Sequence, residues 1–580
     1  QIEFDIQIGL QGNLLWTEKL PLGTIRDPLQ LAVFRYSEVY FISGINTQTE
    51  RLRYYSFLTW AWKNIKEKQN LEKENILDLE KIFTLISSSH HIIHDDEPKG
   101  IRSIGKDHGK KFLTENERIN LDKFISFGKN NKIGYGNYYY SGSLAKLNIL
   151  WDRDGEIMVS PAGEEISNIF AKDLGKIESN FWKTKFSKSE LQGMHNACCC
   201  SLSKDEQNFW KMVFFGFTNQ SKSGTKIDHN KKLELPDPDT LTFEEFHSVS
   251  EYTFNESDLE ELDIDSSDKK EDLTAKIMRT GTFFMLLKII QQATPNSDRM
   301  FMLQTIRDSI YYSEFKKGER INPINFGVLD GYRKYWEVYV HNLYYVSIFE
   351  KILSLITEIT QLTPLGIGVD ELTKKIDKKK FLNHINEFGL SVSDSDTVFD
   401  VYEKISTLLE HKKTNLSSMI TEPDLLEKLL NSEDETESIA IVFILFLLCK
   451  YRYSFFDEKQ LQILSYNQEK FASVSPKTIY DFSEELPLVE FSDWLLKFVI
   501  KRHRHVSAKK LSHGTKAWLF SEEEGILYFN KKIDFKAYHD GKWNNVLEIM
   551  TDLGLVQKKS DEEKVWSVTQ EGEIWLKKIQ

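Results

Sequence analysis

Cysteine is scarce in this sequence: the 580 residues include four cysteines, three of which, at positions 198–200, are consecutive. Neighbouring cysteines cannot easily pair with one another, so we expect no disulfide framework, and reduced thiols predict a cytoplasmic protein. No pair of CxxC motifs with the spacing of a zinc site occurs. We therefore interpret the cysteines as buried, unreactive side chains, with a metal site near His195 as the alternative.

Long apolar runs are also missing. The most apolar stretch, residues 439–449, is bounded by acidic residues and Lys450, whereas a membrane-spanning helix needs about 20 apolar residues. It predicts a buried helix and no membrane contact. The opening residues have neither a basic segment nor a long apolar core, so we expect no signal peptide.

Common nucleotide-binding and catalytic motifs do not occur: there is no Walker A, GxGxxG, HExxH, GxSxG or kinase set. The sequence therefore predicts no cofactor and favours a protein that is not an enzyme. His108-Gly109-Lys110 resembles half of a phospholipase-D-type motif, but no second copy has the right spacing. A further run of six residues suggests a metal site, although a solvent-facing loop is the preferred interpretation, so no metal is predicted: His90, His91, His94, Asp95, Asp96 and Glu97.

Positive charge is in the minority, because the sequence has 75 Lys and Arg but 88 Asp and Glu, which gives a formal net charge of −13. Any contact with nucleic acid must then come from a local basic patch. Two segments are dense in cations, the glycine-rich residues 99–111 and residues 501–510. The alternatives are a solvated loop and the basic C-terminal end of a helix. The predicted nucleic-acid-binding residues are Lys99, Arg102, Lys106, Lys110, Lys111, Arg502, Arg504, Lys509 and Lys510.

The composition is that of a globular protein, with 40% hydrophobic and 13% aromatic residues, which excludes extensive disorder. The length suggests about four folding units. We expect a mainly α-helical multidomain protein with small β-hairpins. The predicted boundaries give a helical N-terminal region, a helical and loop region with an acidic linker, a helical domain and a C-terminal domain: residues 1–175, 176–272, 273–485 and 486–580.

Two segments, residues 147–166 and 553–574, read alike. Each has a helix, a short apolar exit, a polar turn, a strand, a Ser or Thr cap, a Gly-Glu pair and a new helix. In the first, Asp154-Gly155 between apolar runs is a strong hairpin signal, and Ser160 followed by Pro161 begins a helix. This order is typical of winged helices, in which a hairpin lies beside the helix that enters a groove. The sequence therefore predicts two winged-helix-like modules. Such modules bind either nucleic acid or protein.

The N-terminal segment carries a second distinctive pattern. Leu22-Gly23, Ile25-Arg26-Asp27, and then residues 43–57, SGINTQTERLRYYSF, resemble the opening of an uncharacterised group of prokaryotic proteins. Ser43 stands where that group has proline. The resemblance covers roughly the first 170 residues well and the last 80 loosely. Such proteins tend to be encoded among phage-defence genes, so the resemblance implies a defence role but no catalytic residue.

Arginine and tyrosine side chains within this pattern suggest two roles. Arg51 and Tyr55 lie four residues apart and share a helix face, on which they can hold a phosphate. The preferred alternative is that Asp27 pairs with an arginine and fixes the N-terminal loop on an aromatic helix. The residues concerned are Arg26, Arg51, Arg53 and Tyr55.

Together these patterns predict a nucleic-acid-binding or sensor subunit of a prokaryotic anti-phage defence-type system, with DNA or RNA and an enzymatic protein subunit as partners. One alternative is a non-enzymatic adaptor that binds protein. The second is a nuclease with an unrecognised site.

Overall fold

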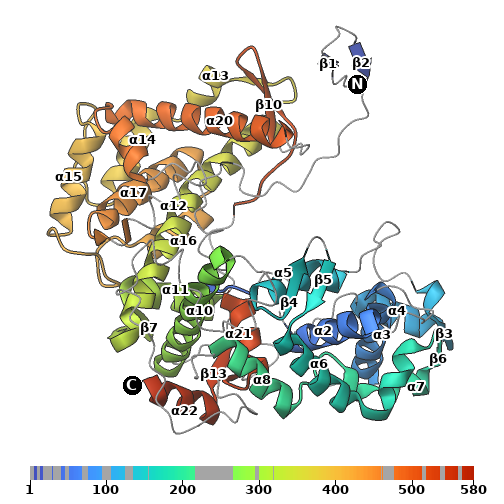
Figure 1. The fold of residues 1–580 in the computed structure, drawn as a ribbon. Helices are drawn as coiled ribbons and strands as arrows, with labels where there is room; N and C mark the ends of the chain where they lie inside the picture. Colours follow the sequence, from blue (N-terminus) through green and yellow to red (C-terminus); the bar gives the residue numbers. More distant parts are fainter. Residues whose placement is uncertain are drawn as a thin grey trace. The chain divides into compact units, whose positions relative to one another are not determined.

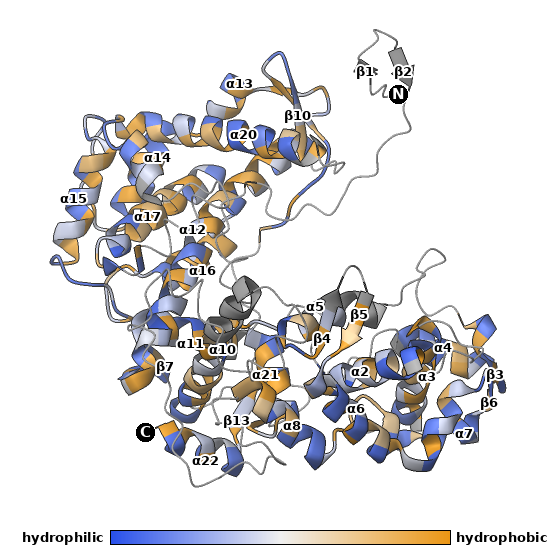
Figure 2. Cartoon of the chain, viewed as in Figure 1, coloured by the Kyte–Doolittle hydropathy of each residue, from blue (hydrophilic) through white to orange (hydrophobic). Residues whose placement is uncertain are grey.

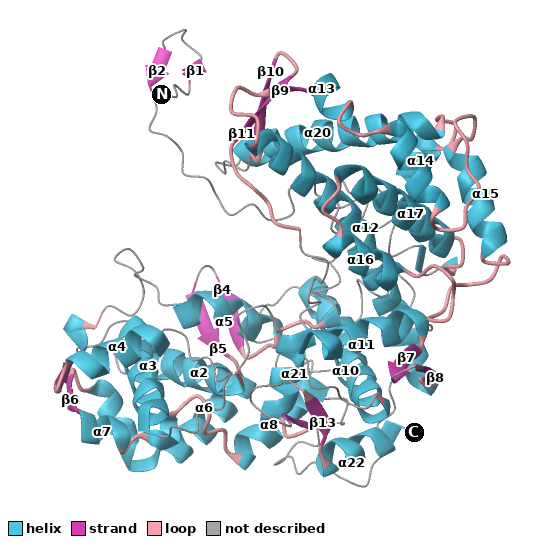
Figure 3. Ribbon diagram, turned by 180° about the vertical axis from the view of Figure 1, so that it is seen from behind, coloured by secondary structure: helices cyan, strands magenta, loops and turns pink. Residues whose placement is uncertain are grey.

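The structure is a computed structural model of the chain, mainly helical, with short antiparallel hairpins between the helices (Figures 1 and 3). A mainly α-helical fold with small β-hairpins is therefore confirmed. The structure describes residues 6–8, 14–16, 29, 41–45, 51–67, 76–93, 106–124, 135–153, 156–215, 266–293, 299–317, 319–458, 460–461, 476–512, 518–535, 543–558 and 565–579.

The chain divides into two compact units. We call residues 35–336 with 540–580 the module unit, because both helix–hairpin–helix modules described below lie in it. We call residues 1–34 with 337–539 the α17 unit, after its helix α17 (Glu435–Tyr453). Residues 540–580 thus belong with the N-terminal half of the chain, whereas the predicted boundaries join them to residues 486–539. The four-part division stays a prediction.

The first half of the module unit alternates helices with short strands. In chain order these elements are α2 (Leu52–Glu67), α3 (Ile76–Ile93), α4 (Lys106–Glu115), β3 (Arg118–Asn120), η1 (Leu121–Lys123), α5 (Tyr135–Lys146), β4 (Leu150–Arg153), β5 (Glu156–Val159), α6 (Pro161–Leu174), η2 (Gly175–Trp182), β6 (Lys185–Ser187), α7 (Lys188–Gln192) and η3 (His195–Ala197).

The rest of the module unit closes with the C-terminal residues of the chain. Its elements are α8 (Lys204–Phe215), α10 (Ser266–Gln292), α11 (Arg299–Tyr312), β7 (Glu314–Lys317), β8 (Arg320–Pro323), η6 (Gly327–Leu329), the start of α12 (Asp330–Gln361), α21 (Trp543–Asp552), β12 (Val556–Lys558), β13 (Trp566–Val568) and α22 (Gln570–Ile579).

Helix α2 is central to the module unit, and its residues from Leu52 to Ala61 are all buried. Phe57 stacks on Phe83 of α3 with ring centroids 4.2 Å apart, and Trp60 lies 5.0 Å from Phe181 of η2. Helices α3, α5 and α6 pack around α2. The aromatic helix predicted from the N-terminal pattern is therefore a core element of this unit.

Two segments that we predicted as loops are partly helical. His90 and His91 lie in the last turn of α3, and residues 106–111 begin α4. Gly109 explains the second difference, because a Cβ atom there would lie 2.3 Å from the Ser88 hydroxyl oxygen of α3. The glycine permits close packing of two helices rather than a flexible loop.

Helix α17 (Glu435–Tyr453) forms the core of the other unit, and every residue from Ser438 to Cys449 is buried. Helices α14, α15, α16 and α19 pack against it. Its N-terminus is capped by Asp434, whose side chain accepts a hydrogen bond from the Glu437 backbone N–H. The prediction of a buried helix at residues 439–449 is confirmed, and among the described helices none has the length and apolar character of a membrane span.

Further helices and strands complete the α17 unit, and most of its helices show both orange and blue residues (Figure 2). The unit also contains a three-stranded antiparallel sheet in the order β10–β11–β9. The elements are β1 (Ile6–Ile8), β2 (Leu14–Trp16), the rest of α12, β9 (Ile367–Gly368), α13 (Val369–Thr373), α14 (Lys378–Asn386), α15 (Val398–Leu408), α16 (Glu422–Asn431), α19 (Pro476–Ser483), α20 (Leu488–Ser512), β10 (Phe520–Glu523) and β11 (Ile526–Phe529).

Candidate functional site

The two similar sequence segments form two helix–hairpin–helix modules, both in the module unit (Figure 1). The first module consists of α5, β4, β5 and α6, and the second consists of α21, β12, β13 and α22. In each, two short antiparallel strands separate the two helices. The predicted hairpins are therefore present, while the winged-helix assignment remains a prediction.

Backbone hydrogen bonds tie the hairpin of the first module to the end of α5. The Ile149 N–H donates to the Leu144 carbonyl at 2.9 Å, and the Ser160 N–H donates to the Ile149 carbonyl at 3.1 Å. The Ser160 hydroxyl donates to the Asn148 carbonyl at 2.7 Å and accepts from the Gly163 N–H at 3.0 Å. One serine therefore closes the hairpin and caps α6, as Ser160 and its following proline predicted.

The second module repeats these bonds atom for atom. The Leu555 N–H donates to the Met550 carbonyl at 2.9 Å, and the Thr569 N–H donates to the Leu555 carbonyl at 3.0 Å. The Thr569 hydroxyl donates to the Gly554 carbonyl at 2.6 Å and accepts from the Gly572 N–H at 3.0 Å. The sequence similarity thus reflects a structural repeat in which Leu144 corresponds to Met550.

The glycine of each Gly-Glu pair allows the second helix to approach the strand. A Cβ atom at Gly163 would lie 2.4 Å from the Ile149 carbonyl oxygen, and one at Gly572 would lie 2.2 Å from the Leu555 carbonyl oxygen. Real Cβ atoms do not approach backbone oxygen so closely, so both positions need glycine.

The two modules differ in the exposure of the helix before the hairpin. In α21, every residue except Thr551 is buried. Trp543 lies 5.7 Å from Trp336, ring centroid to ring centroid, and Glu548 forms an ion pair with Lys558 at 2.7 Å. This helix cannot enter a nucleic-acid groove without leaving its place in the unit.

Helix α5 of the first module has an exposed face instead. Gly142, Ala145 and Lys146 are exposed, at the positions that correspond to Glu548, Thr551 and Asp552 of α21. The first module therefore presents two small residues and a lysine to solvent at the positions where the second module has two buried acidic residues and Thr551.

The end of α21 also caps α2. The Leu52 N–H donates to Asp552 Oδ2 at 2.8 Å, and Arg51 Nη2 lies 2.8 Å from Asp552 Oδ1. All three residues are buried. Burial raises the pKa of Asp552 to about 6, against the opposing effect of Arg51. This ion pair joins the second module to the start of the central helix.

The other residues of the predicted phosphate site also have partners inside the module unit. Arg53 donates to Asp173 Oδ2 at 3.2 Å and to the Asn196 carbonyl at 2.6 Å, and it pairs with buried Glu206. Burial lowers the pKa of Arg53 to about 10. The Tyr55 hydroxyl donates to the Gly44 carbonyl at 2.7 Å. Arg51, Arg53 and Tyr55 thus have structural partners, although not the expected Asp27, which lies with Arg26 outside the described residues.

The first predicted basic segment falls largely on α4. Lys106 is the first residue of that helix, Lys110 is half-buried and Lys111 is exposed. Lys99 and Arg102 lie outside the described residues. The structure therefore places part of the predicted basic loop on a helix of the module unit.

The second predicted basic segment lies on α20 of the α17 unit, and two of its cations have partners there. Arg502 Nε donates to the Leu29 carbonyl at 2.9 Å, and Arg504 forms an ion pair with Glu522 of β10 at 3.0 Å. Lys509 is exposed, and Lys510 lies in the same helix. The two basic segments thus belong to different units.

Within the described residues, one group of His and Cys side chains can hold a metal ion, and it includes none of the predicted nucleic-acid-binding residues. Sequence reasoning also missed the Arg51–Asp552 pair, since nothing local marks residues so far apart in the chain as partners. Comparison of the chain with protein families, curated proteins and solved structures found no match.

Proposed function

We propose that this chain is a nucleic-acid-binding or sensor subunit of a prokaryotic anti-phage defence-type system, working in the cytoplasm beside an enzymatic partner. The observation that carries the proposal is the exposed face of α5 in the first module. A helix with an exposed face next to a hairpin is the arrangement by which winged helices contact a groove. The N-terminal resemblance supports the defence setting.

The first module is the proposed point of contact, and the second is a structural element. Helix α21 is buried and carries Glu548 and Asp552, which would repel phosphate. Helix α5 ends in exposed Lys146, and exposed Lys111 lies on α4 of the same unit. In a chain with a net charge of −13, a few such cations must supply most of the phosphate contacts.

Fluorescence anisotropy of the full-length chain on a short DNA duplex, at several salt concentrations, tests the proposal. Lys111→Glu combined with Lys146→Glu is expected to weaken binding by about tenfold or more at moderate salt, and each lost contact flattens the log–log salt slope by about one unit. The matched control is Lys375→Glu with Lys378→Glu, two exposed lysines of the α17 unit, which leaves binding unchanged. Circular dichroism verifies that each variant is folded.

Two results contradict the proposal. If the parent chain does not bind the duplex or a single-stranded RNA of similar length, nucleic acid is not the ligand. If the double variant binds as tightly as the parent, α4 and α5 are not the contact surface.

Two further outcomes would favour one of the alternatives. Co-purification of one stoichiometric protein partner together with failure to bind nucleic acid would favour the adaptor, and metal-dependent cutting of plasmid DNA would favour a nuclease.

A further inference from the structure

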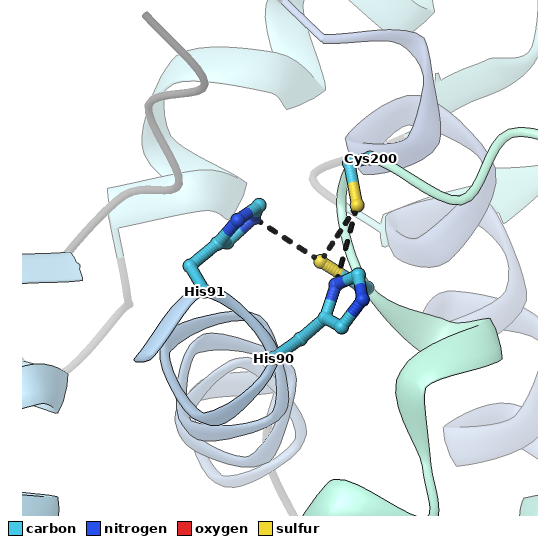
Figure 4. A group of neighbouring side chains, drawn as sticks. His90, His91 and Cys200 are labelled. Atoms are coloured by element: carbon cyan, nitrogen blue, oxygen red, sulfur yellow. Dashed lines mark hydrogen bonds between the residues drawn. The ribbon is translucent and has the colours of Figure 1, made fainter. Parts of the chain in front are cut away.

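Four metal-ligating side chains meet where the end of α3 faces the segment between α7 and α8. His90 and His91 come from the last turn of α3, and Cys198 and Cys200 follow η3. The ligand atoms of these four residues all lie within 4.8 Å of one another. Figure 4 shows His90, His91 and Cys200 pointing toward a common point.

Three distances within this group are close to those between ligands around one small ion. Cys198 Sγ lies 3.4 Å from His91 Nε2, Cys200 Sγ lies 3.4 Å from His90 Nδ1, and the two sulfur atoms are 3.3 Å apart. Tetrahedral zinc, with bonds of about 2.3 Å to sulfur and about 2.0–2.1 Å to nitrogen, requires its ligand atoms to be roughly 3.3–3.8 Å apart. The group therefore needs only small shifts to surround the ion.

We infer that His90, His91, Cys198 and Cys200 bind one Zn²⁺ ion in a closed Cys₂His₂ site. Two thiolates and two imidazoles in a tetrahedral arrangement are typical zinc ligands. An iron–sulfur cluster contains two or more metal atoms. It is held either by four cysteines or, in the Rieske type, by two cysteines on one iron and two histidines on the other. Two thiolates and two imidazoles around a single point favour a mononuclear ion instead.

The third cysteine of the run, Cys199, lies at the edge of this group and is not one of its four members. The Cys199 N–H donates to the Ser87 hydroxyl at 3.2 Å, and Cys199 Sγ lies 4.0 Å from His91 Nε2, farther than either distance that joins Cys198 or Cys200 to a histidine. Residues 198–201 form a turn, closed by the hydrogen bond from the Ser201 N–H to the Cys198 carbonyl at 3.0 Å, and this turn brings the sulfur atoms of Cys198 and Cys200 together. This difference between adjacent cysteines provides a matched control.

Two of the four ligands are buried and two are partly exposed to solvent. Cys198 and His91 are buried, whereas His90 and Cys200 are half-buried, so the ion enters from the side of the second pair. Because four protein ligands leave no position for water or substrate, the site is structural rather than catalytic.

The ion would fasten the α7–α8 segment to α3. That segment supplies the Asn196 carbonyl, which accepts from buried Arg53 of α2 at 2.6 Å. Cys198 and His91 are 107 positions apart, so a bond through the metal closes a long loop and removes conformational freedom from the unfolded chain. The zinc site therefore stabilises the part of the module unit that holds α2.

Metal analysis of the full-length chain tests this inference. The chain is produced without a histidine tag in medium containing zinc, and its metal content is measured by inductively coupled plasma mass spectrometry. The parent and Cys199→Ser are expected to carry one zinc per chain, and Cys198→Ser combined with Cys200→Ser almost none. A parent without zinc, a parent that carries iron instead, or a Cys199→Ser variant that loses as much zinc as the double variant contradicts the site.

A second measurement needs no folded double variant. The parent chain is produced with cobalt in place of zinc, and its absorption spectrum is recorded. A Cys₂His₂ site predicts the intense visible bands of tetrahedral cobalt and a near-ultraviolet band from thiolate to metal. A weak octahedral spectrum, or one without a thiolate band, overturns the inference. Neither measurement depends on the proposed binding of nucleic acid.

Discussion

The first and second modules have the same hydrogen bonds between helix, hairpin and helix, but their surroundings differ. In the second, Asp552 at the end of α21 is buried against Arg51, and Glu548 against Lys558. In the first, the corresponding residues of α5 are Lys146 and Gly142, and both are exposed. One fold therefore serves in one place as part of the core and in the other as a surface element.

This difference shows what a repeated motif indicates and what it does not. The shared caps and glycines determine the backbone geometry, since they make the same contacts in both copies. The side chains on the outer face of the helix before the hairpin determine whether that helix packs inside or meets solvent. The role of each module must therefore be inferred from this face.

The largest effect is expected at the position where the two modules differ most. Asp552→Ala removes the partner of buried Arg51 and is expected to lower the stability of the module unit by about 3–5 kcal/mol, the usual cost of breaking a buried ion pair. Lys146→Ala, at the corresponding exposed position, is expected to change stability by less than about 0.5 kcal/mol. Urea unfolding followed by tryptophan fluorescence measures both. Equal losses of stability in the two variants would contradict the burial of Asp552 and the exposure of Lys146.

An intermediate loss of stability, equal in the two modules, is expected at the glycines that they share. Gly163→Ala and Gly572→Ala each force a Cβ atom against a backbone carbonyl and are expected to cost about 1–3 kcal/mol, as overpacking does. Gly142→Ala in α5 is the control, because a Cβ atom there meets nothing within 4 Å. It is expected to stabilise the chain by up to about 1 kcal/mol. A harmless Gly572→Ala would show that α22 does not pack on the hairpin as described.

The smallest effect is expected at the caps. Ser160→Ala and Thr569→Ala each remove the side chain that caps the second helix and are expected to lower stability by about 1 kcal/mol. The two losses should be similar, because both hydroxyls make two equivalent hydrogen bonds, although the Thr569 hydroxyl also lies 3.1 Å from the Leu555 carbonyl. Thermal unfolding followed by circular dichroism compares them. A loss at only one position would contradict the repeat.

The modules were predictable from the sequence because their signals are local. Ser160, Pro161 and the Asp154-Gly155 pair lie within a few residues of the structures they specify, and the repeat supplies the same order again near the C-terminus. The helical character of the chain and the buried helix at residues 439–449 follow from periodicity and length in the same way.

Contacts between distant residues were not predictable. Neither Asp552 as partner of Arg51 nor the meeting of Cys198 with His91 leaves a local pattern. Charge density in residues 501–510 likewise does not reveal that Arg504 faces Glu522. Gly109 led to the wrong prediction of a loop, because the sequence does not distinguish a glycine that permits two helices to pack closely from a glycine in a loop.

The most direct test of the proposed difference between the modules is hydrogen–deuterium exchange on the full-length chain with and without a short DNA duplex at low salt. Slower exchange is expected in α5 and β4 of the first module when the duplex is present, and unchanged exchange in α21. Slower exchange in α21 without any change in α5, or no change in either helix while the duplex is bound, would contradict that difference.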